Sequence, residues 1–252
     1  NAVAITDHGN MYGVIDFYKA CKAEGIKPVI GCEVYVAPRT RFDRIHELDS
    51  QARHLILLCK DEVGYRNLSH MVSQSYTEGC YIKPQIDLDL LHQRAEGLIC
   101  LSACLAGELP RRLRNGDYEG AKAHALEMDG LFGRGNYYLE LQDHGLEADP
   151  QAIAGLVRLH EETGIPLVCT NDAHYLRRED AQMQKVLVCI QTGRTVNDPS
   201  DLEFQTDQFY IKSLEEMRQA IPDVDEAFEN TVRNAERCNV EFEFIKTKLP
   251  YF

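Results

Sequence analysis

The stretch Thr163-Gly164-Ile165-Pro166-Leu167-Val168 decides the fold. It has the form of a helix end, a glycine that stops the helix, and an apolar run typical of a buried strand. The earlier stretch Glu24-Gly25-Ile26-Lys27-Pro28-Val29-Ile30 has the same form. Such a repeat indicates βα units, which build a parallel sheet covered by helices.

Outward from these two stretches, short apolar runs alternate with segments of helical periodicity. Strands are predicted at residues 2–6, 28–36, 54–60, 98–102, 137–142 and 166–171. Helices are predicted at residues 12–23, 63–76, 118–131, 149–163, 178–191, 213–221 and 225–238. Asp149-Pro150 is predicted as an N-cap followed by a first helical residue, and Gly164 as the helix stop. The regular alternation favours a βα barrel over a doubly wound sheet, and function in such barrels collects at the carboxyl ends of the strands.

Two segments late in the chain do not fit the alternation. Asn197-Asp198-Pro199 is a turn signal, and residues 241–244 and 248–252 look like a linker. The chain starts with Asn and almost directly with a strand, so we expect a fragment whose true N-terminus is missing.

Composition limits the classes of function. The 252 residues, 44% of them hydrophobic, suffice for one large domain or two small ones. A net charge of −13 argues against a stand-alone nucleic-acid binder, because phosphate contacts need Lys and Arg. The nine Cys include no CxxC pair, and their odd number without a signal-peptide pattern favours a reducing cytoplasm. No apolar run reaches the roughly 18–20 residues that cross a membrane, so no membrane partner is expected.

The most suggestive candidate ligands stand at two strand ends. Asp172 and His174 are two residues apart, and such residues point to the same side of an extended segment, where they could hold one metal ion or two adjacent ones. The alternative is that Asp172 caps a following helix and His174 packs against it. Asp7 and His8 follow the first strand in the same way, as ligand or as a ligand's partner, and the alternative is again an N-cap.

Other candidates lie within or beside further strands. Glu33 sits inside an otherwise buried strand, where a carboxylate must bind metal or find a cationic partner. His54 opens an apolar run, a position more often taken by a satisfied polar residue than by a ligand. Cys104 would be a soft ligand for zinc, or else an inert buried thiol. Glu140 and His144 are weaker candidates at another strand end.

Together these residues predict a site with mixed nitrogen, oxygen and sulfur ligands. Such ligands fit a multinuclear Zn or Mn centre, which activates water and stabilises in-line displacement at phosphorus. The sequence contains no P-loop, no GxGxxG and no GxSxG nucleophile elbow.

Five motifs in order resemble a known family. They are Thr6–Gly13, Gly31–Val36, His54–Leu58, Leu101–Leu105 and Thr170–Tyr175. The chain resembles the PHP (polymerase and histidinol phosphatase) domain of the bacterial replicative DNA polymerase III alpha subunit. The resemblance implies a distorted seven-stranded βα barrel whose first strand is missing from this fragment. It places the PHP barrel in residues 1–205, followed in residues 206–252 by a helical extension and linker toward a polymerase palm domain.

The resemblance also implies a metal site. It assigns as metal ligands His8, Glu33, His54, Cys104, Asp172 and His174. It gives catalytic roles to Asp172, His174 and His8, and implies two or three Zn or Mn ions in an intact domain. The family's HxH pair and an Asp from its first strand have no counterpart here.

The activity implied is that of a phosphoesterase domain within a DNA-directed DNA polymerase. The domain would carry a metal-dependent 3′–5′ exonuclease site for proofreading, while the polymerase active site would lie outside this fragment. The implied partners are a DNA primer-template, a proofreading exonuclease subunit and, through other domains, a sliding clamp. The alternative is a non-catalytic scaffold that stabilises the polymerase and docks an exonuclease subunit. A free-standing enzyme for a small phosphate ester, like a histidinol phosphatase, is a third reading.

Overall fold

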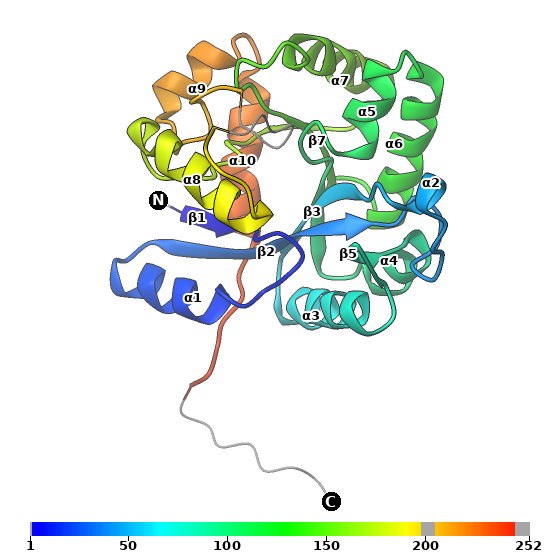
Figure 1. Cartoon of the computed structure of the whole chain (residues 1–252), viewed down its shortest axis with the longest axis horizontal. Coiled ribbons are helices and arrows are strands. Elements are labelled where there is room, and N and C mark those ends of the chain that lie inside the picture. Colours follow the sequence, from blue (N-terminus) through cyan, green and yellow to red (C-terminus); the bar gives the residue numbers. More distant parts are fainter. Residues whose placement is uncertain (1, 198–204, 245–252) are drawn as a thin grey trace, which may run out of the picture. The chain divides into compact units, whose positions relative to one another are not determined.

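Residues 2–197 and 205–244 are described by the computed structural model shown in Figure 1. The chain forms two units: the first runs to Cys100 and resumes at Arg233, and the second spans Leu101–Val232. The predicted domain boundary between residues 205 and 206 stays a prediction.

The first unit is built on a mixed sheet with strand order β4-β5-β2-β3-β6, and β1 also pairs with β2. Its strands are β1 (Ala2–Ile5), β2 (Lys27–Val36), β3 (Arg53–Cys59), β4 (Cys80–Tyr81), β5 (Lys83–Ile86) and β6 (Leu98–Leu101). Its helices are α1 (Val14–Ala23), α2 (His46–Asp49), α3 (Glu62–Thr77) and α4 (Leu88–Arg94). The long strand β2 is parallel to β1 and β5 and antiparallel to β3. Its pairing with these three strands therefore fixes their positions along the sheet.

The second unit contains the parallel strands β7 (Tyr137–Leu141) and β8 (Leu167–Cys169). Its helices are α5 (Glu108–Arg114), α6 (Tyr118–Phe132), α7 (Asp149–Thr163), the short 3₁₀ helix η1 (Arg178–Asp180), α8 (Ala181–Thr192) and α9 (Leu214–Ala220). Helix α10 (Asp225–Arg237) starts in this unit and ends in the first. Its polar side chains dock on β8, since Asn230 Nδ2 donates to the Leu167 carbonyl and Thr231 Oγ1 to that of Cys169.

The predicted α/β class is confirmed, and each of the six predicted strands forms as β1, β2, β3, β6, β7 or β8. The prediction of a parallel sheet is wrong between β2 and β3, which pair antiparallel, and the unpredicted pair β4 and β5 is antiparallel as well. A parallel return needs a crossover, usually a full helix, and the connection between β2 and β3 holds only the short helix α2. The hairpin of β4 and β5 was not predicted, since its strands are too short for a periodic signal.

One further prediction is wrong in detail. Helix α7 has Ala148 as N-cap, and Asp149 is its first residue, buried and accepting hydrogen bonds from the amides of His144 and Leu146. Gly164 does end that helix, with φ at +71°.

Residues 241–244 form neither helix nor strand, and the linker predicted for them stays a prediction. Glu241 accepts hydrogen bonds from Tyr18 and Lys22 of α1, and the ring of Phe242 lies edge-on to that of Tyr18 at 4.8 Å. Part of the predicted turn at 197–199, and residues 248–252, lie outside the described residues. None of the described helices combines the length and apolar character that crossing a bilayer requires.

Two glycines bring α3 against the turn before β6. A Cβ on Gly64 would lie 1.9 Å from the carbonyl oxygen of Gly97, and Gly97 itself has φ at +76°. No side chain fits there, so glycine at both positions lets the helix start pack on the turn.

We predict that Gly64→Ala lowers the free energy of unfolding by about 1–3 kcal/mol, because the added methyl meets backbone that cannot give way. Gly130→Ala is the matched control, since Gly130 also lies within a helix, α6, and has nothing within 4 Å of its Cβ position. That change should stabilise by about 0.5–1 kcal/mol. Urea unfolding of both variants checks the pair, and equal effects would contradict the close approach.

Candidate metal centre

Strand β2 places a carboxylate and an aromatic ring on one face of the sheet. Side chains two apart in a strand share a face, so Glu33 and Tyr35 point the same way. In the antiparallel register Tyr35 stands opposite His54, and Glu33 opposite Ile56. His54 is therefore a diagonal neighbour of Glu33, within reach of its side chain.

The loop after β1 brings an imidazole to the same carboxylate. His8 forms an isolated bridge with Glu33, the Gly9 amide donates to the Glu33 carbonyl, and the Glu33 amide donates to the Asp7 carbonyl. Gly9 has φ at +66°, and a Cβ there would lie 2.9 Å from the Tyr35 ring, so this turn requires glycine. The buried thiol of Cys32 donates to the carbonyls of Asp7 and Asn10 and helps to hold the loop.

His8, Glu33 and His54 form a triad. The Oε1 atom of Glu33 lies 2.6 Å from Nδ1 of His8 and 2.7 Å from Nδ1 of His54. One ligand atom from each residue lies within 4.8 Å of the other two. The Glu33 side chain is only 4% exposed, whereas those of His8 and His54 are 47% and 22% exposed. The site is anchored in the core and open on the imidazole side.

The electrostatics of the triad keep Glu33 ionised. Burial would raise the pKa of Glu33, but hydrogen bonds from His54 and His8, together with their charges, outweigh it and lower the pKa to about 2. A permanent carboxylate beside two imidazoles is a donor set that Zn or Mn accepts. The residues present therefore fit a divalent metal ion.

The other three predicted ligands lie in the second unit. Asp172 Oδ1 is 3.4 Å from His174 Nε2, so the structure brings these two together. Asp172 has φ at +43°, an uncommon conformation for a residue other than glycine. Cys104 is half-buried in the loop after β6, and the residue before it, Ala103, has φ at +65°. Strain of this kind gathers at functional sites, at a cost of about 1–3 kcal/mol per residue.

A buried carboxylate ties the two strained loops together. Glu140, 3% exposed in β7, accepts hydrogen bonds from the Ala103 amide and from the Thr170 hydroxyl. Gln142 Nε2 donates to Glu140 and to Thr170, which closes the network. Glu140 therefore anchors both loops rather than lying free to meet a ligand.

Aromatic packing supports the loop that carries His174. The ring of Phe209 stacks on that of His144 at 4.2 Å and lies edge-on to that of His174 at 5.6 Å. The Phe209 carbonyl accepts hydrogen bonds from the amides of His174 and Tyr175. His144, a weaker candidate from the sequence, is 4% exposed and belongs to this packing.

Comparison with known proteins identifies the family of this chain. The family model of the PHP domain matches residues 1–144, more than half of the chain. The chain belongs to the PHP domain family. The alternation of strands and helices in each unit agrees with the PHP type of βα barrel.

The chain is also similar to several curated proteins. It is 52% identical, over 95% of its length, to DNA polymerase III subunit alpha of Treponema pallidum, of which it covers 20%. It is 47% identical to the protein of the same name from Borreliella burgdorferi, over 94% of the chain and 21% of that relative. It is 43% identical to the protein of the same name from Thermus aquaticus, over 95% of the chain and 20% of that relative. The chain therefore spans about a fifth of the length of these relatives.

Two residues of this chain that support the candidate site residues were not predicted from the sequence to do so. Tyr35 contacts both imidazoles of the triad, and its position two after Glu33 in a strand was the available signal. Phe209 is separated from His174 by a long stretch of chain, and no local pattern links them. The N-cap alternative for Asp7 does not hold, because Gly13 is the N-cap of α1.

We predict that Glu33→Gln weakens Zn²⁺ binding by at least about 10–100-fold, the loss typical when even the partner of a ligand is removed. The amide keeps the shape and removes the charge that both imidazoles face. Competition against a chromophoric chelator measures the affinity. Asp49→Asn is the control, because Asp49 is also a buried carboxylate but pairs with Arg39. Equal affinity of the Glu33 variant and the unsubstituted domain would show that the triad holds no metal.

We predict that Glu140→Ala costs about 2–4 kcal/mol of stability, since it leaves buried donors of two loops without their charged acceptor. Glu147→Ala, a change at an exposed position of the loop after β7, should stay within about 0.5 kcal/mol. Denaturant unfolding compares the two, and a small loss at Glu140 would mean that other bonds hold these loops.

Proposed function

We propose that this chain is the PHP domain of a DNA polymerase III alpha subunit and carries a metal-dependent phosphoesterase site for 3′–5′ excision of nucleotides. The observation that carries the proposal is the His8–Glu33–His54 triad, in a chain that is 52% identical to such a subunit over 95% of its length. We assign DNA synthesis, and the binding of the primer-template and of the replisome partners, to the whole protein. We also propose a cytoplasmic location for that protein.

The triad would hold a divalent metal ion through its two imidazoles and one carboxylate. When bound, such an ion lowers the pKa of a coordinated water and stabilises in-line displacement at phosphorus. Glu33, ionised throughout the neutral range, orients both imidazoles. His8, with 47% of its side chain exposed, lies where a phosphate ester can approach.

The roles of Cys104, Asp172 and His174 rest on the resemblance and stay a prediction. Asp172 faces His174 at 3.4 Å, an arrangement that orients an imidazole for binding metal or moving a proton. We assign both residues, with His8, to the catalytic group, and we assign all six predicted ligands to the metal set.

A second function, as a docking scaffold, is favoured by helix α8. The side chains of Met183, Leu187 and Ile190 follow one another on one face of the helix and are 64%, 57% and 71% exposed. Apolar faces left open in this way mark interaction surfaces. The scaffold reading places a protein partner on α8 and needs no metal.

We predict that primer-terminus excision by the full-length protein, in Zn²⁺ or Mn²⁺, falls by at least about 100-fold in the double variant Asp172→Ala with His174→Ala, because general acid–base help alone contributes about 10²–10⁴-fold. The assay is release of the 3′-terminal nucleotide from a mismatched, end-labelled primer. The double variant Met183→Ser with Leu187→Ser is the control and should excise normally. Undiminished excision by the Asp172–His174 variant would refute the nuclease site, and a metal-free, inactive parent protein would support the scaffold.

A further inference from the structure

A run of alternating aromatic rings and cations leads away from the triad. The Tyr35 ring lies 6.4 Å from the ring of His8, nearly parallel to it, and 5.2 Å from the ring of His54, edge-on. Lys83 Nζ stands 5.4 Å from the centroid of the same Tyr35 ring. An exposed ammonium group is therefore held one ring away from the two imidazoles.

The hairpin of β4 and β5 fixes the position of Lys83. Its second strand pairs with β2, where Gln85 stands opposite Tyr35, and its first strand sets Tyr81 opposite Lys83. The Gln85 side chain donates to the Tyr81 carbonyl at 3.0 Å. At the tip, Ile82 has φ at +57° and is 61% exposed. A β-branched residue in this conformation is strained, so the short tip is held by its surroundings.

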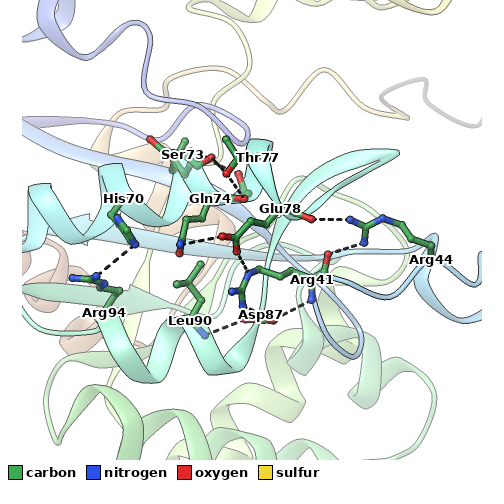
Figure 2. Close-up of polar contacts among 12 residues, drawn as sticks. Arg41, Arg44, His70, Ser73, Gln74, Thr77, Glu78, Asp87, Leu90 and Arg94 are labelled. Atoms are coloured by element: carbon green, nitrogen blue, oxygen red, sulfur yellow. Dashed lines mark hydrogen bonds and ion pairs between the residues drawn. The ribbon is translucent and has the colours of Figure 1, made fainter.

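A second cation stands over the hairpin. The guanidinium of Arg44 lies 5.6 Å from the Tyr81 ring. Its Nη1 donates to the carbonyls of Arg41 and Asp43, and its Nη2 to the carbonyl of Glu78 at 2.8 Å. Figure 2 shows the side chain held in this way against the end of α3. A guanidinium has five N–H donors, so such a group keeps donors for a ligand.

The neighbouring arginines are neutralised by carboxylates. Arg39 pairs with Asp49 at 2.6 Å, and Arg41 pairs with Glu78 at 2.9 Å and with Asp87 at 3.0 Å. Figure 2 shows Arg41 between its two acidic partners. By contrast, neither Lys83 nor Arg44 forms an ion pair within residues 2–197 and 205–244. These two charges remain available to an anion, in a chain whose net charge is −13.

The same loop presents an open aromatic ring. Phe42 is 59% exposed, and the Arg41 guanidinium lies over its ring at 4.2 Å. Arg41 is only 13% exposed and is fixed by Glu78 and Asp87, so its guanidinium supports one face of the Phe42 ring. The exposure of Phe42 leaves room for a planar group on the ring.

Rings beside fixed cations suit one class of ligand. Single-stranded nucleic acid binds through phosphates on cations and bases stacked on aromatic side chains. An acidic peptide would use the cations but gain little from the rings. We propose that the aromatic–basic strip formed by Tyr35, Lys83, Tyr81, Arg44 and Phe42 binds a single-stranded DNA end beside the triad. This inference rests on the proposed function, for which it names the substrate and its line of approach.

The test is binding of a fluorescein-labelled oligothymidylate, followed by anisotropy at several salt concentrations without divalent metal. Two phosphate contacts on a single strand give a slope of log affinity against log salt of about −1.4. The double variant Lys83→Gln with Arg44→Gln should lose most of this slope and bind about 10-fold more weakly at low salt. Phe42→Ala should weaken binding by about 5-fold or more with the slope unchanged.

Matched controls distinguish binding to the strip from a general effect of removing positive charge. Lys19→Gln with Arg66→Gln removes the same charge from exposed positions of α1 and α3 and should leave affinity and slope unchanged. Lys83→Arg with Arg44→Lys keeps both charges and should restore the slope. Circular dichroism melting confirms that each variant is folded.

Three results would overturn the proposal. The first is an unchanged affinity in the variant with Lys83→Gln and Arg44→Gln. The second is an equal loss of affinity in the control with Lys19→Gln and Arg66→Gln. The third is competition by polyglutamate as strong as by oligothymidylate, together with no effect of Phe42→Ala on affinity. Failure of the proposed function would be seen separately, as absence of metal-dependent hydrolysis by the unsubstituted protein, and would leave the binding measurement as it stands.

Discussion

A buried carboxylate shared by two imidazoles is the constraint on which the site depends. Glu33 is nearly inaccessible to water, and an isolated carboxylate there would carry a large desolvation cost. The hydrogen bonds of His8 and His54 offset that cost and hold the pKa of Glu33 at about 2. Removing either imidazole would leave a charge in the core with half its partners, so the loop after β1 and the start of β3 are both tied to β2.

Strand β2 links this constraint to the surface. Its middle carries Glu33, and the next side chain on the same face, Tyr35, lies against both imidazoles. Its end pairs with β5, and the loop that follows contains Phe42 and Arg44. The His8–Glu33–His54 triad and the proposed strip for DNA are thus supported by one rigid strand, which suits a site that must hold a strand end in a fixed position.

The second unit also contains a buried carboxylate in a strand, but with different hydrogen-bond partners. Glu140 is also a buried carboxylate in a strand, but backbone amide and hydroxyl groups satisfy it instead of imidazoles. It stabilises loops in which Ala103 and Asp172 hold uncommon backbone conformations. The stability of a carboxylate network offsets the strain of the loops that carry Cys104, Asp172 and His174.

Local sequence determined the α/β class, the six main strands, most helix positions and the residue types that could bind metal, because periodicity and glycine stops are properties of neighbouring residues. It also placed Glu33 in a buried strand, which already required a partner. It did not determine which partner, since the antiparallel return of β3 depends on a connection without a full crossover helix. Tertiary structure decided that His8 and His54 meet one oxygen of Glu33 and that Glu140 anchors two loops. It also decided that Arg39 and Arg41 pair with carboxylates, whereas Lys83 and Arg44 form no ion pair within the described residues. Each of these outcomes joins residues far apart in the chain, and their pairing follows from strand register and packing rather than from spacing.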